Sequence, residues 1–165
     1  MDDKEKKGVS SKFILPDLAI LDPLLTTNLP ANITASTGID AMVHAIEAFT
    51  SINSNNNPVS KMLSIEALKL LGSSIKTAVF DGHNINARSN MLLGSMLAGK
   101  AFANSPVAAV HALAYPIGGL FNISHGLSNS LVLTSVMKFN SKNEETKKNY
   151  AYLSPYVFKN LDNSK

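Results

Sequence analysis

The chain has 165 residues, a length that suits one domain of ordinary size. Apolar residues make up 45% of it and charged residues only 16%, which excludes a disordered chain and allows a packed core. The absence of cysteine excludes disulfides, thiolate metal ligands and a cysteine nucleophile, and it fits a cytoplasmic protein. No apolar run predicts a transmembrane helix, and the charged residues 1–7 do not resemble a secretory signal.

The net charge of +3 comes from one end of the chain. Residues 1–137 hold nine basic and nine acidic side chains, whereas residues 138–165 hold six lysines and three acidic side chains. A nucleic-acid-binding protein usually carries a basic stripe on a folded face, often with several arginines. Arg88 is the only arginine, so we expect no nucleic-acid partner and interpret the lysines as solvated.

The first 33 residues predict extended chain. Two short apolar runs, at 12–15 and 18–22, are each followed by a proline, Pro16 and Pro23. Proline has no backbone donor and disfavours helix at the residue before it, so these runs predict edge strands or extended linkers.

Helical periodicity begins near residue 34. Apolar residues recur every three or four positions, and Ser36 and Thr37 are the candidate N-caps of the first helix. Pro116, Gly118 and Gly119 are expected to end the fourth helix. The predicted helices span residues 34–51, 58–79, 84–104, 106–114 and 125–139.

The sequence therefore predicts a mainly α, bundle-like fold in three parts. An extended lead-in at 1–33 precedes a helical domain at 34–140, and a polar, lysine-rich segment follows at 141–165. That last segment contains one amphipathic patch, at 150–158, which Pro155 interrupts.

Asp40 and His44 lie four residues apart in the first predicted helix, so their side chains share one face. Both border a strip of apolar residues, where an unpaired carboxylate would be costly. A carboxylate and an imidazole together suit Fe²⁺ or Zn²⁺. The spacing alone also fits a surface pair or a buried hydrogen-bonded pair.

His111 and His125 are fourteen residues apart and would be about 21 Å apart along one straight helix. Pro116 and the two glycines after it argue against such a helix, so the chain can turn back and bring the two rings together. With Asp40 and His44 they would form a sulfur-free site for a divalent cation. His83 lies in a predicted turn and is interpreted as a solvated residue.

Two segments resemble the signatures of the iron-containing (group III) alcohol dehydrogenases. One is TGIDAMVHAIEAF at 37–49, and the other is HALAYPIGG at 111–119 followed by SHG at 124–126. The run at 15–23 and the stretch at 98–104 are also similar to that family, so the resemblance covers about residues 3–140.

The resemblance implies a helical domain like the C-terminal domain of dehydroquinate synthase. It implies reversible oxidation of a small alcohol to an aldehyde or ketone, with NAD or NADP taking the hydride, and a homo-oligomer. It also implies a bound Fe²⁺, with Zn²⁺ as the alternative. The implied metal ligands are Asp40, His44, His111 and His125.

Two further positions take roles from the resemblance. Phe102 matches a position that lines the substrate and nicotinamide pocket in relatives, with plain core packing as the alternative. Many relatives carry a histidine four residues after the third ligand, proposed to relay protons, whereas this chain has Tyr115. A tyrosine can donate a hydrogen bond, but its ordinary pKa near 10 makes a histidine-type relay unexpected.

Family members are about twice as long and begin with a Rossmann-like domain. No glycine-rich phosphate-binding turn follows a strand in these 165 residues, so no cofactor-binding residue is identified. We expect a fragment that carries the metal site and does not turn over alcohol alone. The alternatives are a zinc-dependent polyol dehydrogenase of the glycerol type, a dehydroquinate-synthase-like lyase, or a non-catalytic helical packing module.

Overall fold

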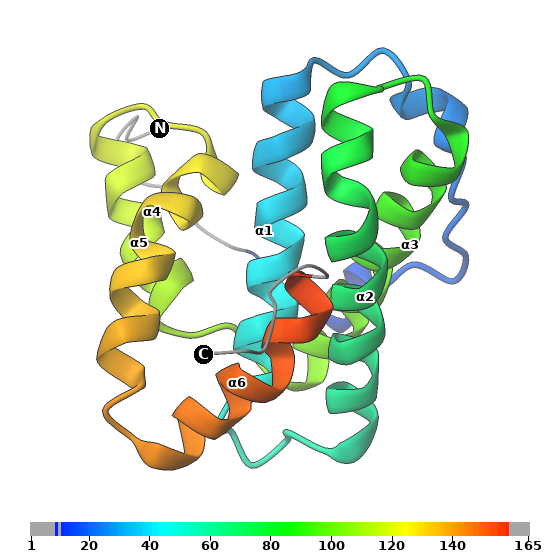
Figure 1. Ribbon diagram of the computed structural model, residues 1–165. Helices are drawn as coiled ribbons and strands as arrows, with labels where there is room; N and C mark the ends of the chain where they lie inside the picture. The colour runs from blue at the N-terminus through cyan, green and yellow to red at the C-terminus, as the bar shows by residue number, and fades with distance from the viewer. Residues whose placement is uncertain (1–8, 10, 159–165) are drawn as a thin grey trace.

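The computed structural model describes residue 9 and residues 11–158, and within them it contains helices and no β-strand (Figure 1). The predicted mainly α fold is thereby confirmed. No helix among these residues is both long and apolar enough to cross a membrane. Two short 3₁₀ helices, η1 (Lys12–Ile14) and η2 (Pro23–Thr26), precede α1 (Ala31–Thr50), α2 (Pro58–Phe80), α3 (Ile85–Asn104), α4 (Ala109–Leu120), α5 (His125–Asn140) and α6 (Glu144–Val157).

Helix α1 stands at the centre of the molecule, with α2 and α3 on one side and α4 and α5 on the other (Figure 1). Helix α6 crosses back to pack against α2 and α1. The main core lies between α1, α2, α3 and α6 and includes the fully buried Leu68 and Leu71. A smaller cluster of Val43, Val110 and Val136 joins α1 to α4 and α5.

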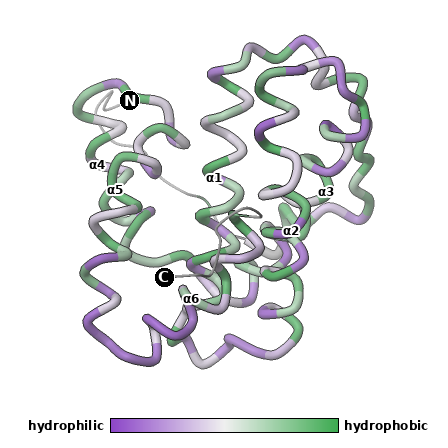
Figure 2. Tube along the Cα trace, viewed as in Figure 1, coloured by the Kyte–Doolittle hydropathy of each residue, from purple (hydrophilic) through white to green (hydrophobic). Residues whose placement is uncertain are grey.

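Polar residues gather in the loop between α1 and α2 and in the loop between α5 and α6 (Figure 2). The first of these loops ends at Asn57, whose side chain accepts a hydrogen bond from the Ser60 N–H and so caps α2. Pro58 follows at the first helical position, where its missing N–H is not needed. The predicted second, third and fifth helices are confirmed with ends shifted by no more than one residue.

Helix α1 begins three residues before the predicted start, and the N-cap prediction was wrong. Pro30 holds the N-cap position, and its carbonyl accepts the first helical hydrogen bond from the Thr34 N–H. Ser36 and Thr37 lie inside the helix, where both hydroxyls donate to the Ile33 carbonyl. A Ser or Thr hydroxyl inside a helix can donate to a backbone carbonyl of the preceding turn, so the presence of these residues does not by itself mark a helix start.

The expected edge strands are also absent from the described part of the lead-in. Ser11 accepts a hydrogen bond from the Phe13 N–H, and Asp22 accepts one from the Leu24 N–H, so each starts a 3₁₀ turn instead. Pro23 occupies the first turn of η2, where its fixed φ is compatible with a helical start. The division of the chain at residues 33 and 140 stays a prediction.

Helix α4 runs through Pro116 and both following glycines, although a break was predicted there. Pro116 removes the hydrogen bond to the Ala112 carbonyl, but Ala112 is exposed, so water can satisfy that carbonyl. The buried face of Val110, Ala114 and Gly118 keeps the helix packed. The chain turns back only after Leu120, at Asn122, whose φ of 50° lies in the left-handed region that asparagine tolerates.

Helix α6 lies in the polar C-terminal segment, for which no helix was predicted. Asn143 caps it by accepting from the Thr146 N–H, and Glu144 and Glu145 occupy its first turn, where the helix dipole favours acidic side chains. Leu153 is buried in the main core, so tertiary packing holds a helix whose sequence is largely polar.

Candidate metal centre

Four potential metal ligands that are distant in sequence meet on the side of α1 that faces α4 and α5. Asp40, His44, His111 and His125 each offer one ligand atom, and all four atoms lie within 4.8 Å of one another. The predicted cluster therefore forms in the structure. Its side chains come from three helices: two from α1, one from α4 and one from α5.

The local structure explains why each side chain reaches this point. Asp40 and His44 lie one turn apart on α1, and His111 lies near the start of α4. The turn at Asn122 brings the chain back so that His125 is the first residue of α5. Gly126 follows it against α1, where a Cβ atom would lie 2.1 Å from the Ser36 carbonyl oxygen and 3.3 Å from Asp40 Cβ. Only glycine permits this approach of α5 to α1.

Two of the distances between donor atoms are close to those expected around one small cation. Ligands bonded to an ion at about 2.0–2.2 Å in a tetrahedral set lie about 3.3–3.6 Å apart. Asp40 Oδ1 lies 3.5 Å from His125 Nε2 and 3.7 Å from His111 Nε2. One carboxylate and three imidazoles are a donor set that both Fe²⁺ and Zn²⁺ accept.

Asn129, one turn after His125 on α5, lies against the same atoms. Its Nδ2 donates to Asp40 Oδ1 at 2.5 Å and lies 3.2 Å from His111 Nε2 and 3.3 Å from His125 Nε2. The residue is fully buried, and among the described residues its Oδ1 finds no hydrogen-bond partner. Asn129 therefore holds the Asp40 carboxylate beside the two imidazoles through its Nδ2, and its own Oδ1 is left as a buried acceptor.

Aromatic rings line two sides of the cluster. Phe102 of α3 stacks on His44 with ring centroids 4.7 Å apart, and Tyr115 of α4 stacks on His125 at 5.3 Å. His44 also stacks on His111 at 4.6 Å. The structure thus brings both residues that the resemblance singled out into contact with ligand rings, and it leaves them half-buried.

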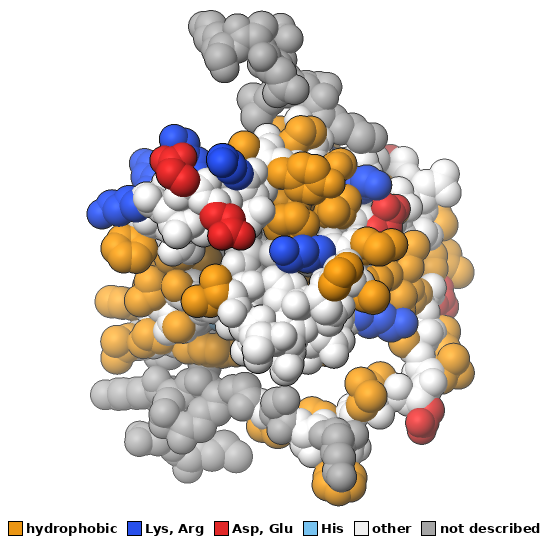
Figure 3. All heavy atoms as spheres, turned by 90° about the horizontal axis from the view of Figure 1, so that it is seen from below, with side chains coloured by type: hydrophobic (Ala, Val, Ile, Leu, Met, Phe, Trp, Pro, Cys, Tyr) orange, Lys and Arg blue, Asp and Glu red, His pale blue; other side chains and the backbone are white. Residues whose placement is uncertain are grey.

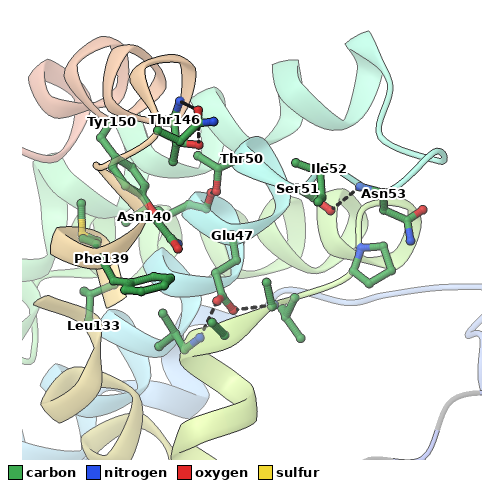
Figure 4. Close-up of a pocket in the computed structure, with 18 of the residues that line it drawn as sticks. Glu47, Thr50, Ser51, Ile52, Asn53, Leu133, Phe139, Asn140, Thr146 and Tyr150 are labelled. Carbon is green, nitrogen blue, oxygen red and sulfur yellow. Dashed lines mark hydrogen bonds between the residues drawn. The ribbon is translucent and has the colours of Figure 1, made fainter. Parts of the chain in front are cut away.

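Glu47 is buried behind His111 and accepts three hydrogen bonds. Its Oε2 lies 2.7 Å from His111 Nδ1 and accepts from the Ala108 N–H at 3.0 Å, while Oε1 accepts from the Val110 N–H at 2.7 Å. Figure 4 shows the carboxylate and its bonds to the start of α4 at the wall of a cavity of about 580 Å³. That cavity, between α1, α5 and α6, also contacts Thr50, Asn140 and Tyr150.

The charges of the cluster are strongly coupled. Burial alone would raise the pKa of Asp40, but the contact with His111 and the charge of His44 outweigh it and lower that pKa. Burial lowers the pKa of His44 to about 4, so this imidazole is neutral near pH 7 and keeps a lone pair for a metal. Near pH 7 Asp40 is therefore ionised and His44 is neutral, the protonation states in which each can act as a ligand of a cation.

His111 has the opposite shift. Burial would lower the pKa of its ring, but the contacts with Asp40 and Glu47 outweigh burial and raise that pKa to about 9. The pKa of Glu47 is lowered, since the bonds from His111 and the backbone N–H groups of Ala108 and Val110 overcome the effect of burial. A metal at this site must therefore displace a proton from His111.

Sequence reasoning placed His83 correctly but missed two residues of the site. His83 lies exposed in the turn between α2 and α3, as predicted. Glu47 and Asn129 were not singled out, although each lies one helical turn after a residue of the cluster: Glu47 is three residues after His44, and Asn129 is four after His125. A buried polar residue one helical turn from a ligand is the signal that points to them.

Comparison with known proteins gives consistent matches. A family model described as the Fe-containing alcohol dehydrogenase family, C-terminal, matches residues 34–164. The long-chain-alcohol dehydrogenase 1 of Geobacillus thermodenitrificans (strain NG80-2) is 48% identical over 134 residues, which cover 81% of this chain and 33% of that protein.

Solved structures match the fold as well. An archaeal halo-thermophilic alcohol dehydrogenase from a Red Sea brine pool superposes with a TM-score of 0.87 at 30% identity, over 94% of this chain and 39% of that one. The sulfoacetaldehyde reductase of Bifidobacterium kashiwanohense, solved in complex with NAD⁺, gives a TM-score of 0.74 at 34% identity, over 80% and 35%. The chain spans about a third of the length of the curated relatives that it matches.

Proposed function

Because the chain belongs to the Fe-containing alcohol dehydrogenase family, we propose that it supplies the metal-binding part of an oxidoreductase that interconverts alcohols with aldehydes or ketones. The observation that carries this proposal is the convergence of four donor atoms, from α1, α4 and α5, within 4.8 Å. A helical module that served only for packing would have no need of a buried cluster of one carboxylate and three imidazoles.

Asp40, His44, His111 and His125 would hold one divalent cation, Fe²⁺ as the expected ion and Zn²⁺ as the alternative. A cation held there supplies Lewis acidity to the oxygen of an alcohol or carbonyl substrate. Asp40 contributes a negative charge to the site at neutral pH, because its lowered pKa keeps it ionised. His44 contributes a neutral nitrogen, because burial lowers its pKa to about 4.

Phe102 and Tyr115 are the proposed substrate contacts of this chain. Phe102 covers the ring of His44 and excludes water from that side of the site. Tyr115 covers the ring of His125, and its hydroxyl group can donate a hydrogen bond to a substrate oxygen. We assign Tyr115 a role in orienting substrate.

The hydride acceptor in this proposal is NAD or NADP. The NAD⁺ complex of the sulfoacetaldehyde reductase, which shares the fold, supports a nicotinamide cofactor. The side of the cluster that carries His125 is the more open, with 34% of that side chain exposed against 2% for His111. We propose that substrate and nicotinamide approach from the His125 side.

The metal content of the chain tests this proposal. The wild-type chain, purified without oxygen, is expected to bind about one Fe²⁺ or Zn²⁺ with four protein ligands. The double variant His111→Ala/His125→Ala should lose the ion. His83→Ala is the matched control, because His83 is exposed and lies outside the cluster. Elemental mass spectrometry measures the metal, and circular dichroism checks that each variant remains helical.

Two results would overturn the proposal. One is a helical wild-type chain that binds neither ion when both are supplied. The other is a double variant that retains as much metal as the wild type and the His83→Ala control.

A further inference from the structure

Glu47 links α1 to the start of α4, the two helices that carry Asp40, His44 and His111 of the cluster. It lies on the same face of α1 as Asp40 and His44, seven and three residues after them. Only 5% of the residue is exposed, yet both carboxylate oxygens are used in hydrogen bonds. An ionised group so deeply buried is costly unless it is fully paired, and here it is.

Helix α4 begins without a cap of its own. Its N-cap residue is Ala108, which has no side-chain acceptor, and no side chain from its own first turn fills the role. Glu47 reaches across from α1 and accepts from two N–H groups at this end, those of Ala108 and Val110 (Figure 4). The positive end of the helix dipole adds to the attraction. The backbone that carries His111 is thereby fixed relative to α1.

The same carboxylate also fixes the ring of His111. Because Glu47 Oε2 can only accept, the 2.7 Å contact requires that His111 Nδ1 carries the proton. The other nitrogen, Nε2, then faces Asp40 Oδ1 at 3.7 Å with its lone pair available once it is unprotonated. A carboxylate that holds the rear nitrogen of a ligating histidine sets both its tautomer and its orientation.

From this geometry we propose that Glu47 is the positioning residue of the metal site, which it serves by capping α4 and presenting His111 Nε2 to the cation. The inference rests on the proposed function, since it assumes that the cluster binds a divalent cation. Glu47 itself contacts neither substrate nor cation in this proposal. It acts only through His111 and the first turn of α4.

The test compares the affinity of Zn²⁺ for the wild type, Glu47→Gln and Glu66→Gln, measured by competition with a chelator. Glutamine keeps the shape but turns an N–H₂ group toward one of three donors, so we expect Glu47→Gln to bind Zn²⁺ about 10–100-fold more weakly. Glu66→Gln makes the same chemical change on the exposed face of α2, where the carboxylate pairs with Lys69, and should leave the affinity unchanged.

A double-mutant cycle separates positioning of His111 from a general effect on the fold. If Glu47 acts through His111, then Glu47→Gln should weaken Zn²⁺ binding little or not at all in a His111→Ala background. Nitrogen-15 NMR of the zinc-loaded wild type should show a proton on His111 Nδ1 and the metal on Nε2. Should Glu47→Gln fail to fold, Glu47→Asp takes its place, since it keeps the charge but is too short to reach all three donors.

The outcomes distinguish this inference from the function on which it rests. A wild type that binds no Zn²⁺ or Fe²⁺ overturns both. A wild type that binds, with Glu47→Gln within twofold of it, overturns the positioning role alone. The same holds if Glu47→Gln weakens binding equally with and without His111, or if His111 ligates through Nδ1.

Discussion

His111 lies between Asp40 and Glu47, and its two ring nitrogens each face one of these carboxylates. In the proposed metal site, a proton and a divalent cation would therefore compete for the same atom, His111 Nε2. Both are attracted by the same negative charges, so the features that favour a metal also raise the pKa of the ring to about 9. The neighbouring His44, with a pKa near 4, offers no such competition near neutral pH.

Affinity for a divalent cation should therefore rise with pH between about 6.5 and 9. In this range one proton must leave His111 for each ion bound, so the affinity of Zn²⁺ should increase by up to about tenfold per pH unit and level off above pH 9. Competition titrations across this range measure the slope, with His83→Ala expected to show the same slope as the wild type. A pH-independent affinity would contradict the prediction.

The stability of the metal-free chain should follow the opposite trend. The pKa of His111 is higher in the folded state than its usual 6.5. Its proton thus stabilises the fold fully below pH 6.5, and this contribution is lost as the pH rises through 9. Bound metal replaces the proton and removes this dependence.

At the level of single residues, the meeting of Asp40, His44, His111 and His125 could be predicted because a family resemblance adds long-range information to local spacing. Asp40 and His44 are visible as a helical pair, but nothing local joins them to His111 and His125. Glu47 escaped notice because a glutamate on a helix is usually solvated, and only the tertiary structure shows that it is buried against α4.

Among the helices, the packing of α5 on α1 decides whether His125 reaches the cluster. The two helices touch at Gly126. A Cβ atom at this position would overlap the Ser36 carbonyl oxygen of α1. Packing at this distance leaves no room for a methyl group and no flexible side chain that could give way, because the nearest atoms belong to the backbone.

Gly126→Ala is expected to push α5 away from α1. The change should destabilise the chain by about 1–3 kcal/mol, the usual cost of overpacking, and weaken metal binding because His125 precedes it. Gly99→Ala is the control, since among the described residues no atom beyond its own stretch of helix lies within 4 Å of an added Cβ, and alanine favours a helix by about 0.5–1 kcal/mol. Urea unfolding and Zn²⁺ titration measure both effects. Equal stability of the two variants would be inconsistent with this packing.

The helices themselves were predictable to the extent that their stability is local. α2, α3 and α5 begin close to proline, asparagine or glycine signals in the sequence and were placed within one residue. α4 and α6 were not, since packing of Ala114 and Gly118 overrides Pro116 and burial of Leu153 holds a polar helix. Tertiary contacts determine whether such segments are helical, and the local sequence pattern does not show those contacts.

For the whole molecule, α1 separates two sides of unequal packing. On one side, α2, α3 and α6 share the main core with α1. On the other, α4 and α5 are joined to α1 through the small cluster of Val43, Val110 and Val136 and through the polar contacts around Glu47. Exposed apolar side chains also gather on this second side, at the left of Figure 3, from α4 and α5: Leu113, Leu120, Leu127, Leu131 and Phe139.

Metal should stabilise these two sides to different degrees. The proposed ligands come from α1, α4 and α5, so any opening that separates α4 or α5 from α1 must break the site, whereas local openings within α2 and α3 need not. At a free metal concentration 100 times the dissociation constant, binding contributes about 2.7 kcal/mol, a factor of about 100 in the population of the open states. Hydrogen exchange followed by mass spectrometry should therefore slow by up to that factor in α4 and α5, and much less in α2 and α3. The His111→Ala/His125→Ala variant should show no such slowing. Equal slowing in all helices would mean instead that the six helices open only together, and that the smaller cluster joins α4 and α5 to α1 as firmly as the main core joins α2 and α3.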